Sequence, residues 1–211
     1  MNSILAESTI TDEKLLRVSA EMDEFEGYER PHGQRIAAIA DALAVEFNLA
    51  SRDRFFLQQA ALVHDIGEVT MNRDYIKAAR VLTDTERIDL HRHPVIGEQD
   101  ASRMGLPRGV QLLIRWHHEW WNGGGYPDGL ENEQTPLAAR ILRVADAYGS
   151  LTTGRPFRAA WPDNVARKYL VEWAGIEFDP AVVKAFMNVA ERTQAVPEPT
   201  GKGQSAERME A

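Results

Sequence analysis

Apolar residues recur at helical spacing along most of the chain, and no segment alternates convincingly between apolar and polar positions. A helix that begins at Pro31 carries four apolar residues on one stripe, namely Ile36, Ile39, Leu43 and Phe47. His32 lies four residues before this stripe begins and shares its face, which we expect to be buried. The pattern therefore predicts helices and no strand.

The same periodicity, together with helix-breaking residues, predicts helices in most of the remaining chain. We place them at 12–25, 31–47, 51–66, 94–104, 108–120, 136–151, 162–174 and 179–193. Gly67 is expected to end the third helix, and residues 67–83 to form a loop with short helical pieces. Thr83 followed by Glu86 is a capping-box pattern, which predicts the start of a short helix. Residues 122–129 hold too many Gly, Pro and Asn residues for a regular element, so we expect a loop.

We expect one helical domain with two appendages. Residues 1–27 form a flexible lead and the first helix, residues 28–195 the main domain, and residues 196–211 a disordered tail rich in Pro, Gly and charge. Four acids near the end of the first helix are interpreted as a solvated face: Glu21, Asp23, Glu24 and Glu26. The expected fold class is all-α.

Composition excludes several classes of protein. The 211 residues are 44% hydrophobic and 27% charged, as in an ordinary globular domain. The longest unbroken apolar run covers only residues 36–40, whereas a membrane-spanning helix needs roughly 20 residues. No signal peptide is evident, so the cytoplasm is the expected location. The formal net charge of −8 argues against nucleic acid polymers as partners, and the absence of Cys excludes disulfides and Cys-ligated zinc.

Three segments place His or Asp where burial is costly without a partner. His64 and Asp65 are adjacent, His117 and His118 are neighbours among tryptophans, and Asp146 lies in the most apolar helix. A buried carboxylate needs a cation or several hydrogen-bond donors. The partner of Asp146 is a metal ion or one of three arginines: Arg140, Arg143 and Arg155.

With His32 and His93, these five residues make seven candidate ligands on separate elements. Imidazole and carboxylate groups suit iron, manganese or zinc. Seven ligands are too many for one ion, but they suit two ions that share a bridging carboxylate, as in two-metal phosphoester hydrolysis.

The motifs around these residues occur in a fixed order. They are His64-Asp65-Ile66-Gly67, His93-Pro94, His117-His118-Glu119 followed by Asn122-Gly123 and Gly125-Tyr126-Pro127, and Val144-Ala145-Asp146-Ala147-Tyr148 followed by Arg155-Pro156-Phe157-Arg158. From about residue 30 to about residue 190, the chain resembles the HD-GYP family of the HD superfamily. The resemblance implies a single HD-superfamily helical domain and a metal-dependent phosphodiesterase. Its substrate would be cyclic di-GMP, and its product linear pGpG, GMP or both.

The resemblance also implies a role for each ligand. One ion would be held by His32, His64, Asp65 and Asp146, and the other by Asp65, His93, His117 and His118. Iron and manganese are the expected divalent ions, and a hydroxide bridging them would attack phosphorus. Some members hold a third ion through a glutamate four residues before the first histidine. That position is Tyr28 here, so we expect two ions; Glu26 and Glu29 are nearby acids without the family spacing.

We therefore take His64, Asp65 and Glu68 as catalytic residues. Arg155 matches a family position that contacts phosphate, and Arg158 adds a second guanidinium. Tyr126, the third substrate-binding candidate, belongs to a Gly-Tyr-Pro loop with two interpretations. The loop shapes the cleft or docks a signalling protein such as a diguanylate cyclase, or it is a structural turn in which Tyr126 packs over glycines. The oligomeric state is not indicated.

Three positions depart from the family pattern without removing a ligand. Glu68 stands where a lysine is usual, and Asn122 and Gly149 each replace an aspartate. An anion at position 68 opposes an anionic substrate unless it binds metal or pairs with Arg155. Two alternatives stay open for this reason: a non-catalytic or weakly active signalling module that binds ligand or partner proteins, and an HD hydrolase of another nucleotide phosphoester.

Overall fold

The structure is a computed structural model that describes residues 12–28, 30–78, 80–155 and 158–194. The described residues form helices, loops and isolated backbone bridges, with no strand among them, so the predicted all-α class is confirmed. The α-helices are α1 (Asp12–Glu26), α2 (His32–Glu46), α3 (Ser51–Leu62), α4 (Ile66–Met71), α5 (Asp84–Leu90), α6 (His93–Arg103), α7 (Arg108–Trp116), α8 (Leu137–Thr152), α9 (Asp163–Glu172) and α10 (Pro180–Gln194). Short 3-10 turns cover Asp74–Lys77 and Asn132–Gln134. Residues 1–11 and 196–211, where we predict a flexible lead and a tail, lie outside the described residues.

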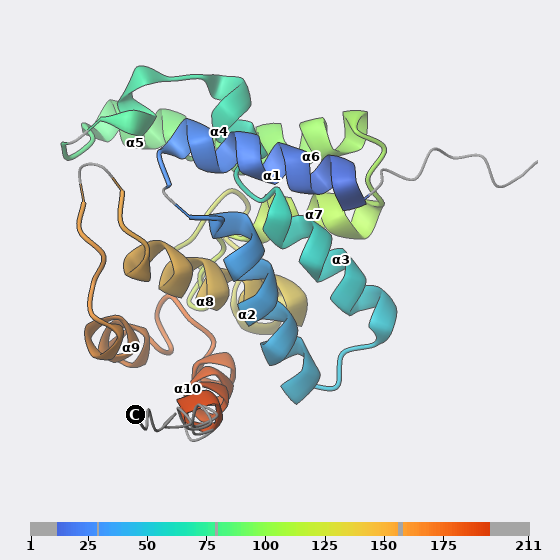
Figure 1. Ribbon diagram of the computed structural model, residues 1–211, viewed down its shortest axis with the longest axis vertical. Helices are drawn as coiled ribbons and strands as arrows, with labels where there is room; N and C mark the ends of the chain where they lie inside the picture. The colour runs from blue at the N-terminus through green and yellow to red at the C-terminus, as the bar shows by residue number, and fades with distance from the viewer. Residues whose placement is uncertain (1–11, 29, 79, 156–157, 195–211) are drawn as a thin grey trace, which may run out of the picture.

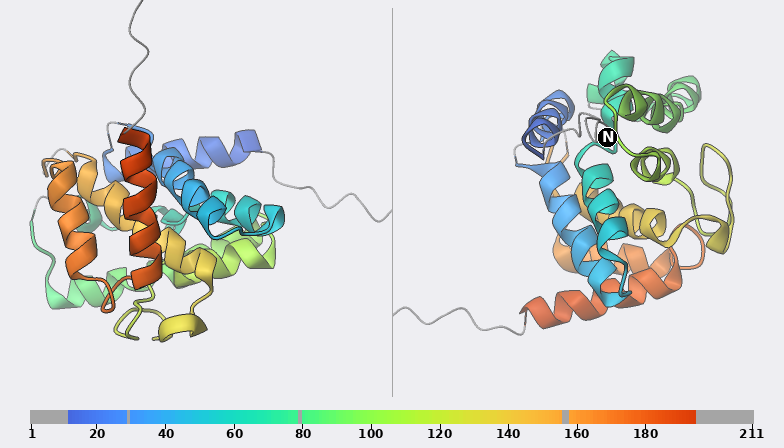
Figure 2. Two further views of the ribbon diagram at one scale, coloured as in Figure 1. Left: turned by 90° about the horizontal axis from the view of Figure 1, so that it is seen from below. Right: turned by 90° about the vertical axis from the view of Figure 1, so that its right-hand side faces the viewer.

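Helices α2, α3 and α8 pack against one another in the middle of the molecule. Figure 1 shows α1, α4, α5 and α6 on one side of these helices and α9 and α10 on the other. Figure 2 shows α10 lying across α2 and α8, both of which it contacts. The predicted stripe of α2 faces this core, since Ile36 and Leu43 are fully buried and Ile39 and Phe47 partly so. No described helix is long and apolar enough to cross a membrane.

The acidic end of α1 is not the solvated face that the sequence suggested. Glu21 and Glu24 are exposed, but Asp23 and Glu26 are buried because the helix turns them toward the domain. The carboxylate of Asp23 accepts hydrogen bonds from the backbone N–H groups of His32 at 3.0 Å and Gly33 at 3.3 Å. Asp23 therefore caps the start of α2, which Pro31 leaves without a side-chain cap.

We predicted that Gly67 ends the third helix, and this prediction is wrong: Gly67 lies inside α4. The chain bends earlier, at residues 63–65, which places His64 and Asp65 between α3 and α4. A Cβ atom on Gly67 would lie 2.0 Å from the carbonyl oxygen of His93 and 2.8 Å from the backbone nitrogen of Gly97. The glycine therefore permits the close packing of α4 on α6 that brings the segments of Asp65 and His93 together.

Two further helix ends test the sequence interpretation. The capping box is confirmed, because the side chain of Thr83 accepts from the N–H of Glu86, and the Glu86 carboxylate accepts from the N–H of Thr83. The predicted helix 108–120 is four residues too long, since α7 ends at Trp116. The carbonyl oxygen of His118 accepts from the N–H of Tyr126 at 3.1 Å, so the glycine-rich loop takes a hydrogen bond that a longer helix would use.

Candidate metal centre

The seven predicted ligands lie together in two groups. One ligand atom each of His32, His64 and Asp146 lies within 4.8 Å of the others, and the same holds for the second group, which contains Asp65, His93, His117 and His118. His32, His64, His93 and His117 are at most 2% exposed, Asp65 and Asp146 are buried, and His118 is partly buried. The side chains come from the starts of α2 and α6, the bends after α3 and α7, and the middle of α8.

Asp65 connects the two groups through its two carboxylate oxygens. Oδ2 lies 3.0 Å from Nε2 of His64, and Oδ1 lies 3.2 Å from Nε2 of His93 and 3.3 Å from Nε2 of His117. Nε2 of His93 is also only 3.4 Å from Nε2 of His117. Asp65 therefore has the geometry of a bridging ligand, with one oxygen toward each group.

Three of the histidines present their Nε2 atoms to this carboxylate for the same local reason. His64, His93 and His117 each place Nδ1 against the carbonyl oxygen of the residue three positions earlier. The distances are 3.0, 2.8 and 2.6 Å, to Ala61, Leu90 and Ile114. A carbonyl oxygen can only accept, so Nδ1 carries the hydrogen and the neutral ring keeps its lone pair on Nε2. Such second contacts fix the tautomer of metal-binding histidines.

The electrostatics of the centre call for a cation. Asp65 Oδ1 and His64 Nε2 are buried and have no hydrogen-bond partner among the described residues. Burial opposes charge on both groups, yet the carboxylate of Asp65 raises the pKa of His64 well above its ordinary value, and His64 in turn holds the pKa of Asp65 well below its own. Without a metal, a proton on His64 supplies the positive charge. Lone pairs that face one another at these distances fit one or more divalent cations.

Of the three arginines considered as partners of Asp146, Arg143 contacts it. Nη1 of Arg143 lies 3.1 Å from Asp146 Oδ2 and 3.1 Å from His118 Nδ1. Arg140 instead pairs with Asp179, and Arg155 pairs with Glu26. Asp146 therefore forms an ion pair with Arg143 and also belongs to a group of possible metal ligands.

A second cluster covers the His32 side of the centre. The ring of Tyr28 lies 3.8 Å from that of His32 with the planes 17° apart. Nη2 of Arg155 donates to the hydroxyl oxygen of Tyr28 and, at 2.7 Å, to Oε2 of the buried Glu26. The phosphate-contact candidate Arg155 is therefore already engaged by two side chains. Glu29 lies outside the described residues.

Glu68 is buried in the first turn of α4, close to these charges. Burial, followed by the negative charge of Asp65, raises the pKa of Glu68 to about 8, and the charge of Arg155 opposes this shift. Glu68 is not among the two groups of candidate ligands. Its carboxyl group is protonated at neutral pH in the metal-free protein, which weakens the repulsion that we expected toward an anionic substrate.

The Gly-Tyr-Pro loop is fixed by packing and by Glu119. The carboxylate of Glu119 accepts from the backbone N–H groups of Asp128 at 2.7 Å and Leu130 at 3.0 Å. Tyr126 stacks on His91 at 3.9 Å and on His118 at 4.8 Å. These contacts give the loop a structural role and place Tyr126 directly against a candidate ligand.

Gly149 and Ser150 of α8 lie beside the group of ligands that contains His32 and Asp146. A Cβ atom on Gly149 would lie 3.0 Å from Cγ1 of Ile36 and 3.4 Å from Cε1 of His32, so the glycine lets α8 pack closely on α2. The hydroxyl of Ser150 donates to Asp146 Oδ1 at 3.0 Å. Sequence reasoning missed Ser150; its position four residues after Asp146, on the same helix face, was the available signal.

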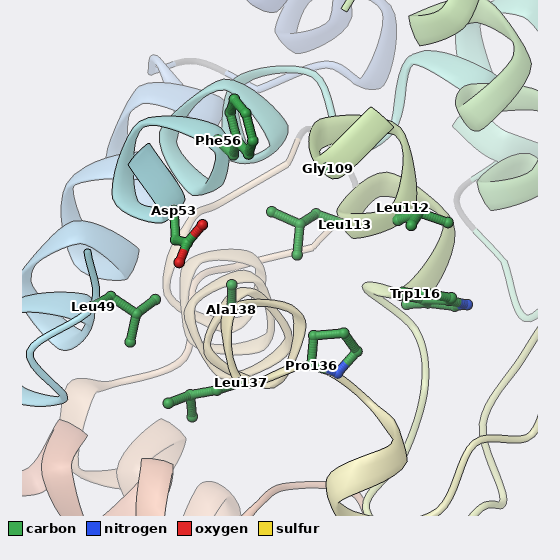
Figure 3. A pocket seen from close by; sticks show the side chains of 10 residues that line it. All are labelled: Leu49, Asp53, Phe56, Gly109, Leu112, Leu113, Trp116, Pro136, Leu137 and Ala138. Atoms are coloured by element: carbon green, nitrogen blue, oxygen red, sulfur yellow. The ribbon is translucent and has the colours of Figure 1, made fainter. Parts of the chain in front are cut away.

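An apolar cavity of about 350 Å³ lies away from these groups, between α3, α7 and the start of α8. Figure 3 shows its lining residues, which include Phe56, Leu113, Trp116 and Leu137 and none of the candidate ligands. The candidate metal centre is therefore separate from this apolar cavity.

Comparison with known proteins places this arrangement in a family. The family described as HD domain matches residues 20–182. The chain belongs to the HD domain family. Its motifs and its similarity to cyclic dinucleotide phosphodiesterases place it with the HD-GYP proteins of that family.

Among curated relatives, this HD domain protein is 32% identical to the cyclic di-GMP phosphodiesterase response regulator RpfG of Xanthomonas campestris, over 83% of this chain and 47% of that protein. It is 35% identical to the cyclic di-GMP phosphodiesterase PA4108 of Pseudomonas aeruginosa, over 76% of this chain and 39% of that protein. The 3'3'-cGAMP-specific phosphodiesterase 3 of Vibrio cholerae is 29% identical, over 77% of this chain and 36% of that protein. The chain thus spans half or less of the length of these relatives.

Solved structures share the fold. The cyclic GMP-AMP specific phosphodiesterase V-cGAP3 of V. cholerae superposes with a TM-score of 0.66 at 18% identity, over 85% of this chain and 49% of that one. Bd1817 of Bdellovibrio bacteriovorus, described as an HDG"Y"P protein, gives a TM-score of 0.64 at 21% identity, over 76% of this chain and 52% of that one.

Proposed function

We propose that this protein is a metal-dependent phosphodiesterase that hydrolyses cyclic di-GMP to linear pGpG, GMP or both. The observation that carries the proposal is the carboxylate of Asp65, whose two oxygens face the imidazoles of two different ligand groups. The names of the relatives, cyclic di-GMP and 3'3'-cGAMP phosphodiesterases, support a cyclic dinucleotide as the substrate class.

The ligands would be divided as the sequence suggests. His32, His64, Asp65 and Asp146 would hold one divalent ion, and Asp65, His93, His117 and His118 the other, with iron or manganese as the expected metals. When bound, such ions lower the pKa of water and neutralise charge on a phosphate. The carbonyl contacts of the histidines orient the rings and leave Nε2 as the nitrogen that would bind metal.

Other side chains around the centre would receive the substrate. Arg155 and Arg158 are the proposed phosphate contacts, with Tyr126 at the cleft edge. Arg155 must exchange part of its contact with Glu26 and Tyr28 for a phosphate oxygen. Glu68 lies close enough to Asp65 and Arg155 for their charges to shift its pKa in the metal-free protein, and bound cations near Asp65 would lower that pKa.

The test is turnover by purified protein of known metal content. Protein loaded anaerobically with Fe²⁺ or Mn²⁺ is incubated with cyclic di-GMP and, separately, with 3'3'-cGAMP, and the products are separated by chromatography. We expect linear dinucleotide or mononucleotide from cyclic di-GMP, and none from Asp65→Asn. Preferred cleavage of 3'3'-cGAMP would reassign the substrate, and no cleavage of either by metal-loaded protein would refute the proposed cyclic dinucleotide phosphodiesterase activity.

A second candidate is a signalling module that binds a cyclic dinucleotide or a partner protein without turnover. The engagement of Arg155 by Glu26 and Tyr28 favours it. A partner such as a diguanylate cyclase would meet the loop around Tyr126 and Pro127, next to a cavity of about 400 Å³ that His91 and Ile96 also line. Binding of cyclic di-GMP by the metal-loaded protein without any product would support this candidate.

A further inference from the structure

Arg143 is a largely buried cation, with its side chain 14% exposed, that contacts one candidate ligand from each group. Its Nη1 lies 3.1 Å from Nδ1 of His118 and 3.1 Å from Oδ2 of Asp146. On its other side, Nη2 pairs with the carboxylate of Glu177, which also accepts from the hydroxyl of Tyr169 at 3.0 Å. The guanidinium is thus fixed between the metal centre and a buried carboxylate.

The two contacts have opposite consequences for metal binding. A carboxylate has several lone pairs, so Asp146 can accept from Arg143 and still bind an ion. A neutral imidazole has one nitrogen lone pair, and Arg143 occupies it on His118. The other ring nitrogen then carries hydrogen, and an imidazolium would have no lone pair at all. Whichever nitrogen is the ligand, His118 cannot bind metal while this contact holds.

We propose that Arg143 competes with metal for His118, so that the two ions bind with unequal affinity. This inference rests on the metal centre in our proposed function. The tighter ion lies among His32, His64, Asp65 and Asp146, where Arg143 orients the Asp146 carboxylate. The weaker ion lies with Asp65, His93 and His117, and it gains His118 only when Arg143 moves away.

A purely structural role for Arg143, as the counter-ion of Glu177, can be separated from this one. Arg140 lies one turn earlier on α8 and pairs in the same way with Asp179, while its Nε donates to the carbonyl oxygen of Thr135 at 2.8 Å. No hydrogen bond or ion pair joins Arg140 to a candidate ligand among the described residues. Arg140→Met is therefore a matched control that removes a comparably part-buried ion pair from the same helix.

The experiment measures Mn²⁺ binding to the chelator-treated 211-residue chain by equilibrium dialysis and elemental analysis. Wild type should show two classes of site. Arg143→Met should tighten the weaker class by at least about tenfold, whereas Arg140→Met should leave both classes unchanged. His118→Ala should change the weaker class less than about threefold in wild type, but it should abolish the gain in Arg143→Met.

Arg143→Met leaves Glu177 without its cation, so Arg143→Met/Glu177→Gln is measured as well and should show the same tightening even if the single variant is unstable. The inference is overturned if neither variant tightens the weaker class, if His118→Ala costs as much in wild type as in Arg143→Met, or if no protein binds Mn²⁺. Two classes of Mn²⁺ site without cyclic dinucleotide hydrolysis would refute the proposed enzymatic function but leave this inference intact.

Discussion

Tyr28 lies flat on the imidazole of His32, with the ring centroids 3.8 Å apart. The hydroxyl of Tyr28 also accepts a hydrogen bond from Arg155, so one side chain links a candidate ligand to a candidate phosphate contact. Tyr28 stands four residues before His32, where the resemblance to the HD-GYP family would place a third metal ligand. Here the residue supports a histidine instead.

This stack predicts a loss of metal affinity when the ring is removed. Tyr28→Leu should lower the Mn²⁺ affinity of the site formed by His32, His64 and Asp146 by roughly tenfold. Losses of this size are common when a residue that positions a metal ligand is removed. Tyr28→Phe keeps the stack and should stay within about threefold of wild type. Mn²⁺ titration of both variants checks this, and equal affinity in wild type and Tyr28→Leu would contradict it.

The two-sided position of Asp65 predicts that its loss is more severe than the loss of any one histidine. Asp65→Ala should lose both metal ions or nearly both, while His93→Ala should mainly weaken one, because lost ligands are not readily replaced in a fixed site. Elemental analysis after gel filtration measures both. Asp41→Ala, which removes a carboxylate paired with Arg54 near the surface, is the control. Full metal content in Asp65→Ala would disprove the bridging role.

Glu68 predicts how the stability of the metal-free protein depends on pH. Its pKa in the folded state is about 8, against an ordinary value of 4.5, so between these values the folded state holds a proton that the unfolded state has lost. Stability contributed by this group is therefore present at low pH and lost as the pH rises through 8. The slope is at most about 1.4 kcal/mol per pH unit.

Glu68→Gln removes this titration. Its stability relative to wild type, measured by urea unfolding in the presence of chelator, should improve steadily from pH 5 to pH 8. Glu21→Gln, at an exposed position of α1, should show no such trend. A constant difference between Glu68→Gln and wild type over this range would show that Glu68 is already ionised.

Two helical glycines predict very different tolerance of a methyl group. Gly67→Ala places Cβ 2.0 Å from the carbonyl oxygen of His93, so α4 and α6 must separate, and we expect a loss of about 3 kcal/mol or more. Gly149→Ala meets only side-chain atoms at 3.0 Å and beyond, and should cost less than about 2 kcal/mol. Urea unfolding compares them. Equal stability of the two variants would contradict this reading of the α4–α6 contact.

The sequence was most informative about the histidines, because a histidine on an apolar helix face needs a polar partner or a metal ion. Histidines on apolar faces predicted which side chains meet, and the structure brings all seven candidates together. The bend at residues 63–65 could not be predicted, because Gly67 looks like a helix end until the backbone of His93 is known to lie against it. Local patterns report spacing along the chain, whereas a close approach between helices depends on the partner.

The buried charges were harder to predict than the ligands. Glu26 belonged to an acidic run that resembles a solvated surface, and only the packing of α1 turns it toward Arg155. Arg143 was one of three possible partners for Asp146, and the sequence could not choose among them because all three arginines have acids within reach. Which buried acid and base pair with each other is decided by tertiary contacts.

The carbonyl groups that hold His64, His93 and His117 belong to the last turns of α3, α5 and α7, respectively. The carboxyl end of a helix carries a partial negative charge, equivalent to roughly half an electron, from its aligned peptide dipoles. Three such ends converge on this centre and add to the charges of Asp65 and Asp146. We therefore expect the metal-free centre to favour divalent cations, and an anionic substrate to bind more tightly once such ions have offset the negative charge that the backbone and the carboxylates supply.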